Sequence, residues 1–213
     1  MEIKVFYFNV FRVCCYLAWD ETKECVLIDP GFNSEDEFSR LKSFVEEKGL
    51  RVTGILLTHG HLDHTFGLTK AALHFSGANV YAHPLEVERI KGADPLAAYF
   101  DLESSVYSGP VTEIGEGDSV SFGNCSLEVL HTPGHTAGGV CYFCRKEGIL
   151  FSGDTLFAGS IGRTDLQGGD YDALRSSILD KLARLEGDVE VLPGHGPVTN
   201  LGYEMATNPF LEQ

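Results

Sequence analysis

The chain has 213 residues, 43% of them hydrophobic, and a formal net charge of −15. This length and composition predict a folded protein with a well-buried core, and no apolar run reaches the ~20 residues that span a bilayer. So acidic a surface repels phosphate backbones and disfavours a nucleic-acid partner. The N-terminus, MEIKVFYFNV, alternates apolar and polar residues and lacks the continuous apolar core of a signal peptide. We therefore expect no membrane segment and a cytoplasmic location.

The N-terminal half predicts five short strands, over residues 2–9, 13–19, 25–29, 54–58 and 79–83. A helix is expected over 34–50, where Ser34 and Glu37 have the spacing of a capping box. A second helix is expected over about 65–76. The segment 84–112 has no clear pattern.

The C-terminal half predicts strand pairs and one long helix. Two strands around a Gly-Asn turn are expected within 115–131, and others over 139–144, 148–153 and 189–194. The helix is expected over 171–185, where apolar residues recur on one face. The strands form two clusters, each followed by helices. This order predicts two packed sheets with helices outside, an α/β fold of the four-layer αββα type in a single domain over 1–213.

Six cysteines include one C-x-x-C pair, Cys141 and Cys144, inside an expected strand. A single pair of this kind is weak evidence for zinc binding or redox chemistry. We interpret these cysteines as small buried apolar residues, and we expect no disulfides in a reducing compartment.

Four polar loops follow apolar strands, and each has a glycine beside a histidine or an aspartate. They are THGHLDH (58–64), HTPGHT (131–136), FSGDT (151–155) and LPGHG (192–196). Glycine lets the chain turn sharply, and loops at strand ends can assemble a site from distant parts of the sequence. The loops supply seven candidate metal ligands: His59, His61, Asp63, His64, His135, Asp154 and His195. Several ligands at such spacings indicate a metal site far more strongly than one histidine does.

The spacing divides these ligands into two groups. His59 and His61 point the same way on an extended loop, and with His135 they would form a three-histidine set that leaves a position open for water. A turn into the next helix would let Asp63 and His64 hold a second ion. That second group is completed by His195, and Asp154 could bridge the two ions through its two oxygens. The other three histidines, His74, His83 and His131, are interpreted as structural.

These motifs resemble the metallo-β-lactamase superfamily. THGHLDH matches its H-x-H-x-D-H signature, and the later ligands follow in the order and loop contexts of that family. TPGHTAGG, SGDTLF, GSIGRTD and LPGHG are similar to motifs of its glyoxalase II-like branch. The resemblance implies the αββα fold and a two-metal site with the division of ligands given above. It also implies that Asp29, in LIDPG, is a buried aspartate that orients the metal loop.

The resemblance implies a hydrolase with two divalent ions, zinc first, with iron or manganese also compatible. The pKa of water falls to ~7 in such sites, which supplies a nucleophile at neutral pH. Asp63 would orient this water and shuttle its proton. A thiolate leaving group needs little protonation, so the expected substrate is S-lactoylglutathione or a similar acyl thioester.

Substrate binding is less defined by the sequence. Glyoxalase II enzymes have a helical C-terminal domain that binds glutathione, and this chain ends about 18 residues after His195, so we expect that domain to be absent. Arg163, in GSIGRTD, stands where the family has a basic residue near the glutathione carboxylates. A substrate contact and a salt bridge to Asp165 are equally open for it. The oligomeric state is also open.

Two other functions are compatible with these motifs. A persulfide dioxygenase, whose family shares GRTD, would hold one iron through His59, His135 and Asp154. The glycine-flanked His195 favours the hydrolase instead. A metal-bearing scaffold without activity is the third option, although oxygen-reducing relatives carry a glutamate where this chain has His61. A metal count separates the hydrolase, which would hold two ions, from the dioxygenase, which would hold one iron.

Overall fold

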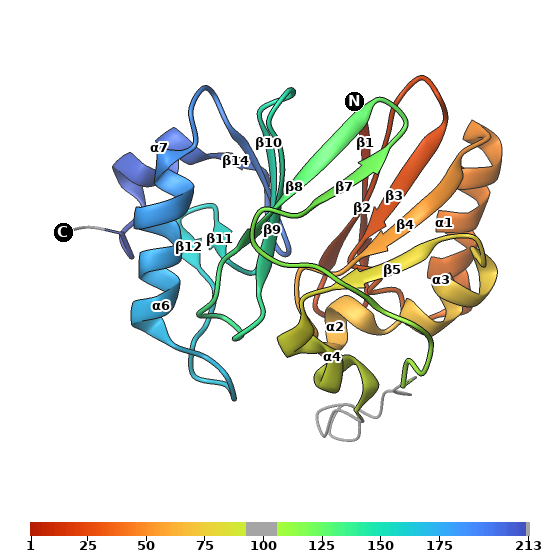
Figure 1. Ribbon diagram of the computed structural model, residues 1–213, viewed down its shortest axis with the longest axis horizontal. Helices are drawn as coiled ribbons and strands as arrows, with labels where there is room; N and C mark the ends of the chain where they lie inside the picture. The colour runs from red at the N-terminus through yellow and green to blue at the C-terminus, as the bar shows by residue number, and fades with distance from the viewer. Residues whose placement is uncertain (93–105, 212–213) are drawn as a thin grey trace.

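The computed structural model describes residues 1–92 and 106–211. In this part of the chain, two six-stranded sheets pack face to face, and helices cover the outer side of each sheet (Figure 1). The layers therefore run helix, sheet, sheet, helix, which confirms the predicted αββα class.

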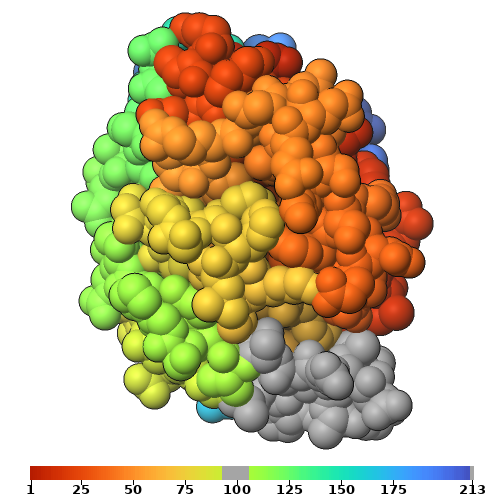
Figure 2. Space-filling model, turned by 90° about the vertical axis from the view of Figure 1, so that its right-hand side faces the viewer, coloured from red at the N-terminus to blue at the C-terminus, as the bar shows by residue number. Residues whose placement is uncertain are grey.

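The first sheet has the order β1-β2-β3-β4-β5-β6. Its strands are β1 (Glu2–Phe8), β2 (Val13–Trp19), β3 (Glu24–Ile28), β4 (Arg51–Leu56), β5 (Asn79–Ala82) and β6 (Thr112–Glu113). The strands from β1 to β3 pair antiparallel, whereas β3 to β6 pair parallel. Its helices are α1 (Glu35–Lys48), α2 (Leu62–Thr65), α3 (Leu68–His74) and α4 (Pro84–Lys91). Figure 2 faces the side of the molecule where α1 and α3 form the surface.

The second sheet has the order β14-β13-β10-β9-β8-β7. Its strands are β7 (Ser119–Phe122), β8 (Cys125–His131), β9 (Val140–Cys144), β10 (Ile149–Gly153), β13 (Glu190–Pro193) and β14 (Thr199–Asn200). Among the described residues of this sheet, β10 and β13 pair parallel and the other neighbouring strands pair antiparallel. A small hairpin of β11 (Leu156–Phe157) and β12 (Ser160–Ile161) follows β10. The outer layer contains α6 (Tyr171–Ser176), a π-helical segment (Ser177–Lys181), a 3-10 turn (Leu182–Arg184) and α7 (Leu201–Thr207).

Large side chains fill the space between the sheets. Tyr16, Phe122, Tyr142 and Phe151 are buried there, and the rings of Tyr16 and Phe151 lie 5.3 Å apart. Burial of each such side chain contributes about 1.5–3 kcal/mol. Separate apolar clusters fill the space between each sheet and its helices. The two sheets therefore form a rigid base for the loops at their ends.

Two buried tyrosines connect the sheets beside the predicted metal loops. The hydroxyl of Tyr142, on β9, donates to the carbonyl of Leu57 at 2.7 Å. The hydroxyl of Tyr16, on β2, donates to the carbonyl of Pro193 at the same distance. Each acceptor lies two residues before a predicted ligand, His59 or His195. Each sheet thus holds the chain where a ligand loop leaves the other sheet.

The first predicted helix has only half of the expected capping box. The side chain of Ser34 accepts a hydrogen bond from the amide of Glu37, as predicted, and α1 ends at Gly49 in the left-handed conformation with φ 63°. The Glu37 carboxylate, however, accepts from the amides of Asn33 and Asn9. It therefore fixes the β1–β2 turn to the helix instead of returning to the Ser34 amide.

The expected helix over 65–76 was wrong in its bounds. The chain turns earlier, at His61, and α2 begins at Leu62. The helix then breaks at Gly67, where a Cβ atom would collide with the ring of Phe32. The amide of Gly67 donates to the carbonyl of Pro30 at 2.8 Å, outside the helix, and helical periodicity alone does not reveal this long-range bond.

Other elements were missed or simplified by the sequence prediction. The helix expected over 171–185 widens in its π-helical segment and then tightens in its 3-10 turn, and β14, α4 and α7 were not predicted. Helix α4 has recognisable signals in retrospect, because His83 caps its N-terminus and Pro84 occupies its first position.

All six cysteines are buried, as predicted, and Cys141 and Cys144 lie on β9. Among the described residues, no helix has the length and apolar character needed to cross a membrane.

Candidate metal centre

The predicted ligand loops meet at the ends of strands from both sheets. The loop after β4 carries the four ligands of THGHLDH, and the loop between β8 and β9 carries His135. Asp154 directly follows β10, and His195 comes two residues after β13. The structure therefore brings together all seven residues that the sequence singled out.

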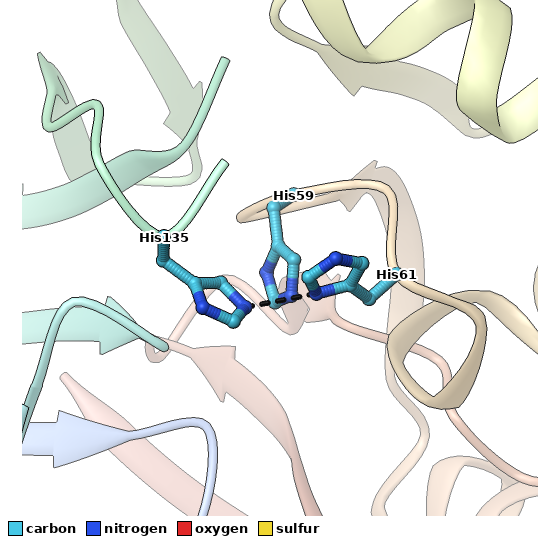
Figure 3. A group of neighbouring side chains, drawn as sticks. All are labelled: His59, His61 and His135. Carbon is cyan, nitrogen blue, oxygen red and sulfur yellow. Dashed lines mark hydrogen bonds between the residues drawn. The ribbon is translucent and has the colours of Figure 1, made fainter. Parts of the chain in front are cut away.

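Three histidines form the first ligand group (Figure 3). One ring nitrogen from each of His59, His61 and His135 lies within 4.8 Å of the other two. Nδ1 of His61 lies 2.8 Å from Nε2 of His135. Nitrogen atoms from three buried rings that converge in this way match the donor set of a catalytic zinc site.

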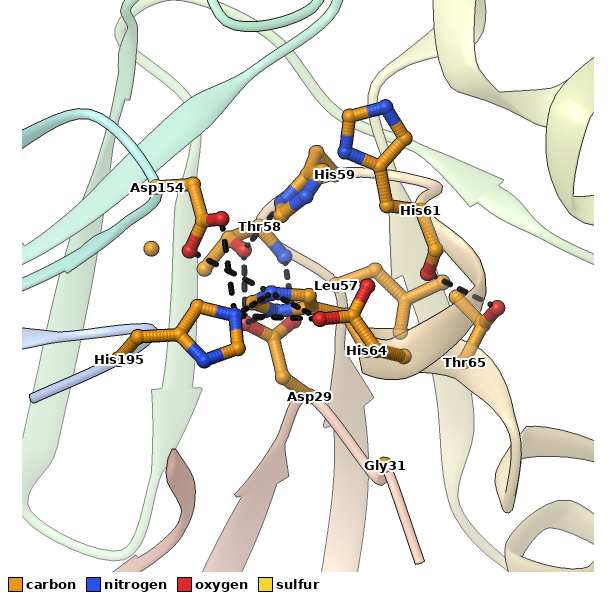
Figure 4. A network of polar contacts seen from close by, with 12 residues as sticks. Asp29, Gly31, Leu57, Thr58, His59, His61, His64, Thr65, Asp154 and His195 are labelled. Atoms are coloured by element: carbon orange, nitrogen blue, oxygen red, sulfur yellow. Dashed lines mark hydrogen bonds and ion pairs between the residues drawn. The ribbon is translucent and has the colours of Figure 1, made fainter. Parts of the chain in front are cut away.

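An aspartate and two histidines form the second group (Figure 4). Oδ2 of Asp63 lies 3.1 Å from Nε2 of His195 and 3.8 Å from Nε2 of His64. The two Nε2 atoms lie 3.3 Å apart. Because α2 begins at Leu62, Asp63 and His64 lie in its first turn, whereas His59 and His61 precede it. The rings of His59 and His64 lie 4.1 Å apart, where the two groups meet.

Asp154 lies between the two groups. Its Oδ2 is 3.6 Å from Nε2 of His135 and 3.7 Å from Nε2 of His195. Its Oδ1 is 3.4 Å from Nε2 of His64. One carboxylate therefore faces ligand nitrogens of both groups, which is the placement that a bridging ligand requires.

The buried polar atoms of the site fit a bound cation. Nε2 of His59 and Oδ1 of Asp154 are buried without a hydrogen-bond partner among the described residues. Nε2 of His61 also lacks a partner there, but the nitrogen of this ring that faces His135 is Nδ1. Buried polar atoms nearly always have a partner, so a cluster of exceptions needs an explanation. Imidazole nitrogens and a carboxylate oxygen are the donors that divalent ions prefer in such sites.

Hydrogen bonds on the outer side fix the orientation of four rings through Nδ1. The pairs are His59 with the hydroxyl of Thr58 at 3.0 Å, His64 with Oδ2 of Asp29 at 2.9 Å, His135 with the carbonyl of Arg163 at 2.8 Å, and His195 with the carbonyl of Phe11 at 3.1 Å. In each ring Nε2 then faces the centre of the site. Such outer partners fix the tautomer and raise the basicity of a metal-binding histidine.

Asp29 has the orienting position that the resemblance implied. Besides His64, it accepts hydrogen bonds from the amide of Thr58 at 2.8 Å and from its hydroxyl at 2.7 Å. Asp29 follows β3 and adopts a positive φ of 49°, which turns the chain below the loop. It therefore supports His64 directly and His59 through Thr58.

Burial and neighbouring charges shift the pKa values of the ligand side chains in different directions. Burial, followed by the neighbouring histidines, lowers the pKa of His59 and of His61, that of His61 to about 3. Burial alone would also lower the pKa of His64, but Asp154 and Asp63 raise it well above its usual value. Burial opposes ionisation of Asp63 and Asp154, yet His64 holds the pKa of both below the usual range. His59 and His61 are thus neutral, whereas the second group combines the cationic ring of His64 with the anionic carboxylate of Asp63.

A cavity of about 740 Å³ opens beside both groups. Its apolar wall contains Phe11, Leu62, Phe157, Ile161 and Leu166, and ligand side chains line the other part. The sequence prediction missed these apolar residues, because loop positions of this kind carry no recognisable pattern.

Arg163 also lines the cavity. Its Nε and Nη2 donate to the two carboxylate oxygens of Asp165 at 2.7 and 2.8 Å, and both side chains are exposed. The salt bridge considered from the sequence is therefore present. A substrate contact stays a prediction.

The three remaining histidines lie outside the ligand groups. His83 caps α4 and stacks on His131, with ring centres 4.3 Å apart. Nε2 of His131 lies 3.0 Å from the carbonyl of Ala137, and His74 lies on α3. Their contacts agree with the structural interpretation.

The αββα layers, with a His/Asp cluster at the strand ends beside an open cavity, define a metallo-hydrolase architecture. A family model described as the metallo-beta-lactamase superfamily matches residues 9–195. The chain belongs to this superfamily.

One curated relative and two solved structures are similar to nearly the whole chain. The chain is 36% identical to a hydroxyacylglutathione hydrolase, GloC, from Haemophilus influenzae, over 99% of this chain and 98% of that protein. Its structure is similar to that of the B3 metallo-beta-lactamase BLEG-1, with a TM-score of 0.89, 35% identity and full coverage of both chains. A similar structure is TTHA1623 in a di-iron-bound form, with a TM-score of 0.86 and 38% identity, over 98% of this chain and 100% of that one. These likenesses support a metal-dependent hydrolase that acts on a small molecule.

Proposed function

We propose that the protein is a thioester hydrolase with two divalent ions, and that it acts on S-lactoylglutathione or a similar acyl thioester. The observation that carries this proposal is the position of Asp154 between two ligand groups that face one cavity. The likeness to a hydroxyacylglutathione hydrolase along nearly the whole chain supports the substrate class.

The seven ligands would hold the ions, with His59, His61 and His135 on the first, Asp63, His64 and His195 on the second, and Asp154 between them. When bound, a pair of divalent ions lowers the pKa of water to ~7 and polarises a carbonyl. Zinc is the ion we propose, and the same donors accept iron or manganese.

Asp63 is the residue we propose for proton transfer. Its carboxylate lines the cavity and contacts His195 at 3.1 Å, so it faces both the second ligand group and the substrate space. His64 lowers the pKa of Asp63 against the effect of burial, which keeps the carboxylate ionised and able to orient a water molecule. A thiolate leaving group needs no strong acid, which suits a cavity walled largely by apolar side chains.

Arg163 is the residue we propose for binding a carboxylate of the substrate. Its pair with Asp165 is exposed, and solvent screens the attraction between exposed partners. A substrate carboxylate can therefore replace Asp165 at little cost. The forked guanidinium group suits a carboxylate in the same two-point geometry.

The proposal is tested by elemental analysis of the purified protein together with assays on S-lactoylglutathione, on glutathione persulfide with oxygen uptake, and on a chromogenic cephalosporin. We expect two metal ions per chain and thioester hydrolysis as the main activity. A single iron with oxygen uptake would overturn the proposal in favour of a dioxygenase. Predominant cephalosporin cleavage would instead favour a β-lactamase, and two bound ions without any of these activities would favour a scaffold.

The Asp154→Ala variant tests the bridging role. We expect this variant to lose metal and thioester hydrolysis together, because each ligand group loses a donor. If both ions remain bound in the variant, Asp154 is not the bridge.

A further inference from the structure

A buried glutamate on α4 contacts both loops that carry the three-histidine group. The side chain of Glu86 is only 2% exposed. Its Oε2 accepts a hydrogen bond from the amide of Gly60 at 2.9 Å, and its Oε1 accepts one from the amide of Gly138 at 2.8 Å. Gly60 lies between His59 and His61, and Gly138 lies three residues after His135 in the same loop.

The backbones of both loops lie so close to this carboxylate that a side chain at the contact positions would collide with it. A Cβ atom at Gly60 would lie 2.9 Å from Oε2 of Glu86, and one at Gly138 would lie 2.8 Å from its Cγ. Glycine at both positions therefore permits the contact. Each carboxylate oxygen is directed at one loop, and Glu86 belongs to none of the candidate metal groups among the described residues.

The negative charge of Glu86 is balanced locally. Nε of Arg89, one turn further along α4, lies 3.6 Å from Oε2. Nη2 of the same guanidinium donates to the carbonyl of Gln167 at 2.8 Å, in the loop that also contains Arg163. Helix α4 thus reaches three loops around the site through two side chains. Two charge-assisted hydrogen bonds from backbone amides are stronger than neutral ones.

We propose that Glu86 is a positioning residue that sets the distance between the two loops carrying the first ligand group. The nitrogen atoms of His61 and His135 come from these separate loops and lie 2.8 Å apart. Without the carboxylate, two buried amides lose their acceptor and the loops lose their common point of attachment. The inference rests on the proposed metal site but not on the substrate.

The test is the affinity of the purified protein for Zn²⁺, measured by competition with a chromophoric chelator, in wild type, Glu86→Gln and Glu86→Ala. Loss of an outer partner typically lowers metal affinity by about 10–100-fold. We expect Glu86→Gln, which keeps one acceptor oxygen, to lose affinity by this factor for the more tightly bound ion, the one held by the first ligand group. Glu86→Ala should lose more. The visible spectrum of the Co²⁺-loaded protein should change as well, because it reports ligand geometry.

Glu204→Gln is the matched control. Glu204 is fully buried on α7 and accepts a backbone hydrogen bond from Gly159 at 2.8 Å, and its other hydrogen bonds come from Thr199 and Asn208, outside the ligand loops. We expect this variant to lose thermal stability while its Zn²⁺ affinity and Co²⁺ spectrum match wild type. Equal Zn²⁺ affinity in Glu86→Gln and wild type, or equal losses in Glu86→Gln and Glu204→Gln, would overturn the inference.

Gly60→Ala covers the case in which the Glu86 variants do not fold. Its added Cβ disturbs the same contact from the loop side while leaving the carboxylate in place. We expect weaker Zn²⁺ binding, and unchanged Zn²⁺ binding would count against the inference. Loss of thioester hydrolysis with a preserved Glu86 effect would refute only the proposed substrate, whereas wild-type protein that binds no Zn²⁺ would refute both proposals.

Discussion

Oδ2 of Asp29 lies 2.9 Å from Nδ1 of His64, and both side chains are buried. The same carboxylate accepts two hydrogen bonds from Thr58, whose hydroxyl lies 3.0 Å from Nδ1 of His59. One residue at the end of β3 therefore orients a ligand from each of the two groups (Figure 4).

The Asp29→Asn variant should lose affinity for both ions. An amide cannot accept all three of these hydrogen bonds in the same geometry, and removal of an outer partner lowers metal affinity by about 10–100-fold. Metal content after dialysis against a chelator measures the effect. Asp20→Asn is the control, because Asp20 is 4% exposed and its carboxylate bonds to Thr22 and Asn124, away from the site. Equal metal content in the two variants would refute the prediction.

Binding of the second ion should strengthen as the pH rises. Burial opposes protonation of His64, but Asp154 and Asp63 raise its pKa well above the usual value, so in the metal-free protein the ring keeps its proton at neutral pH. An ion must displace that proton, and affinity then rises about tenfold per pH unit for each proton released. Because burial lowers the pKa of His59 and His61, those rings release no proton in this range.

Competition for Zn²⁺ at about pH 6 and about pH 8 separates binding of the first ion from binding of the second. The affinity for the second, more weakly bound ion should change much more with pH than the affinity for the first. The contribution of His64 to the stability of the metal-free protein should follow the opposite direction. A raised pKa in the folded state contributes stability that is complete below the ordinary histidine value of about 6.5 and is lost as the pH rises through the raised value. Equal pH dependence of both binding steps would contradict this assignment of charges.

Part of this architecture could be predicted from the sequence because it depends on residue type and spacing. Alternating strands and the Ser34 cap predicted the layers, and the chemistry of five histidines and two aspartates predicted the cluster. The hydrogen bonds from ligand rings to the carbonyls of Arg163 and Phe11 could not be predicted, because a backbone acceptor has no residue-type signature. Glu86 was missed because its partners are two amides distant in sequence. A single domain over 1–213 and a substrate contact by Arg163 stay predictions.

Gly194→Ala should disturb the bridge between the ligand groups. A Cβ atom at this position would overlap Oδ1 of Asp154 and would lie 2.8 Å from Cε1 of His64. Displacement of this carboxylate should lower metal content, which elemental analysis after chelator dialysis measures. Gly77→Ala is the control, since a Cβ atom there meets nothing within 4 Å. Full metal content in Gly194→Ala would show that Asp154 can move without loss of the site.

The hydrogen bonds of Tyr16 and Tyr142 across the sheets should contribute to stability as well as to the position of the ligand loops. In Tyr142→Phe the buried carbonyl of Leu57 loses this donor, and an unsatisfied buried group costs about 1–3 kcal/mol. Denaturant unfolding of the metal-free protein should show a loss of this size. Tyr171→Phe is the control at a position that is 47% exposed, where we expect a change within about 0.5 kcal/mol.

The metal-bound protein should reveal the second role of Tyr142. Leu57 is followed by Thr58 and His59, so a free carbonyl at Leu57 lets the start of the loop move relative to β9. The bond between the amide of Val140 and the carbonyl of Thr58, at 2.9 Å, still holds the loop to the second sheet. We therefore expect Zn²⁺ affinity to fall by less than in Asp29→Asn, where both groups lose an orienting bond. A larger loss in Tyr142→Phe would mean that the sheet contact, and not Asp29, determines where the loop lies.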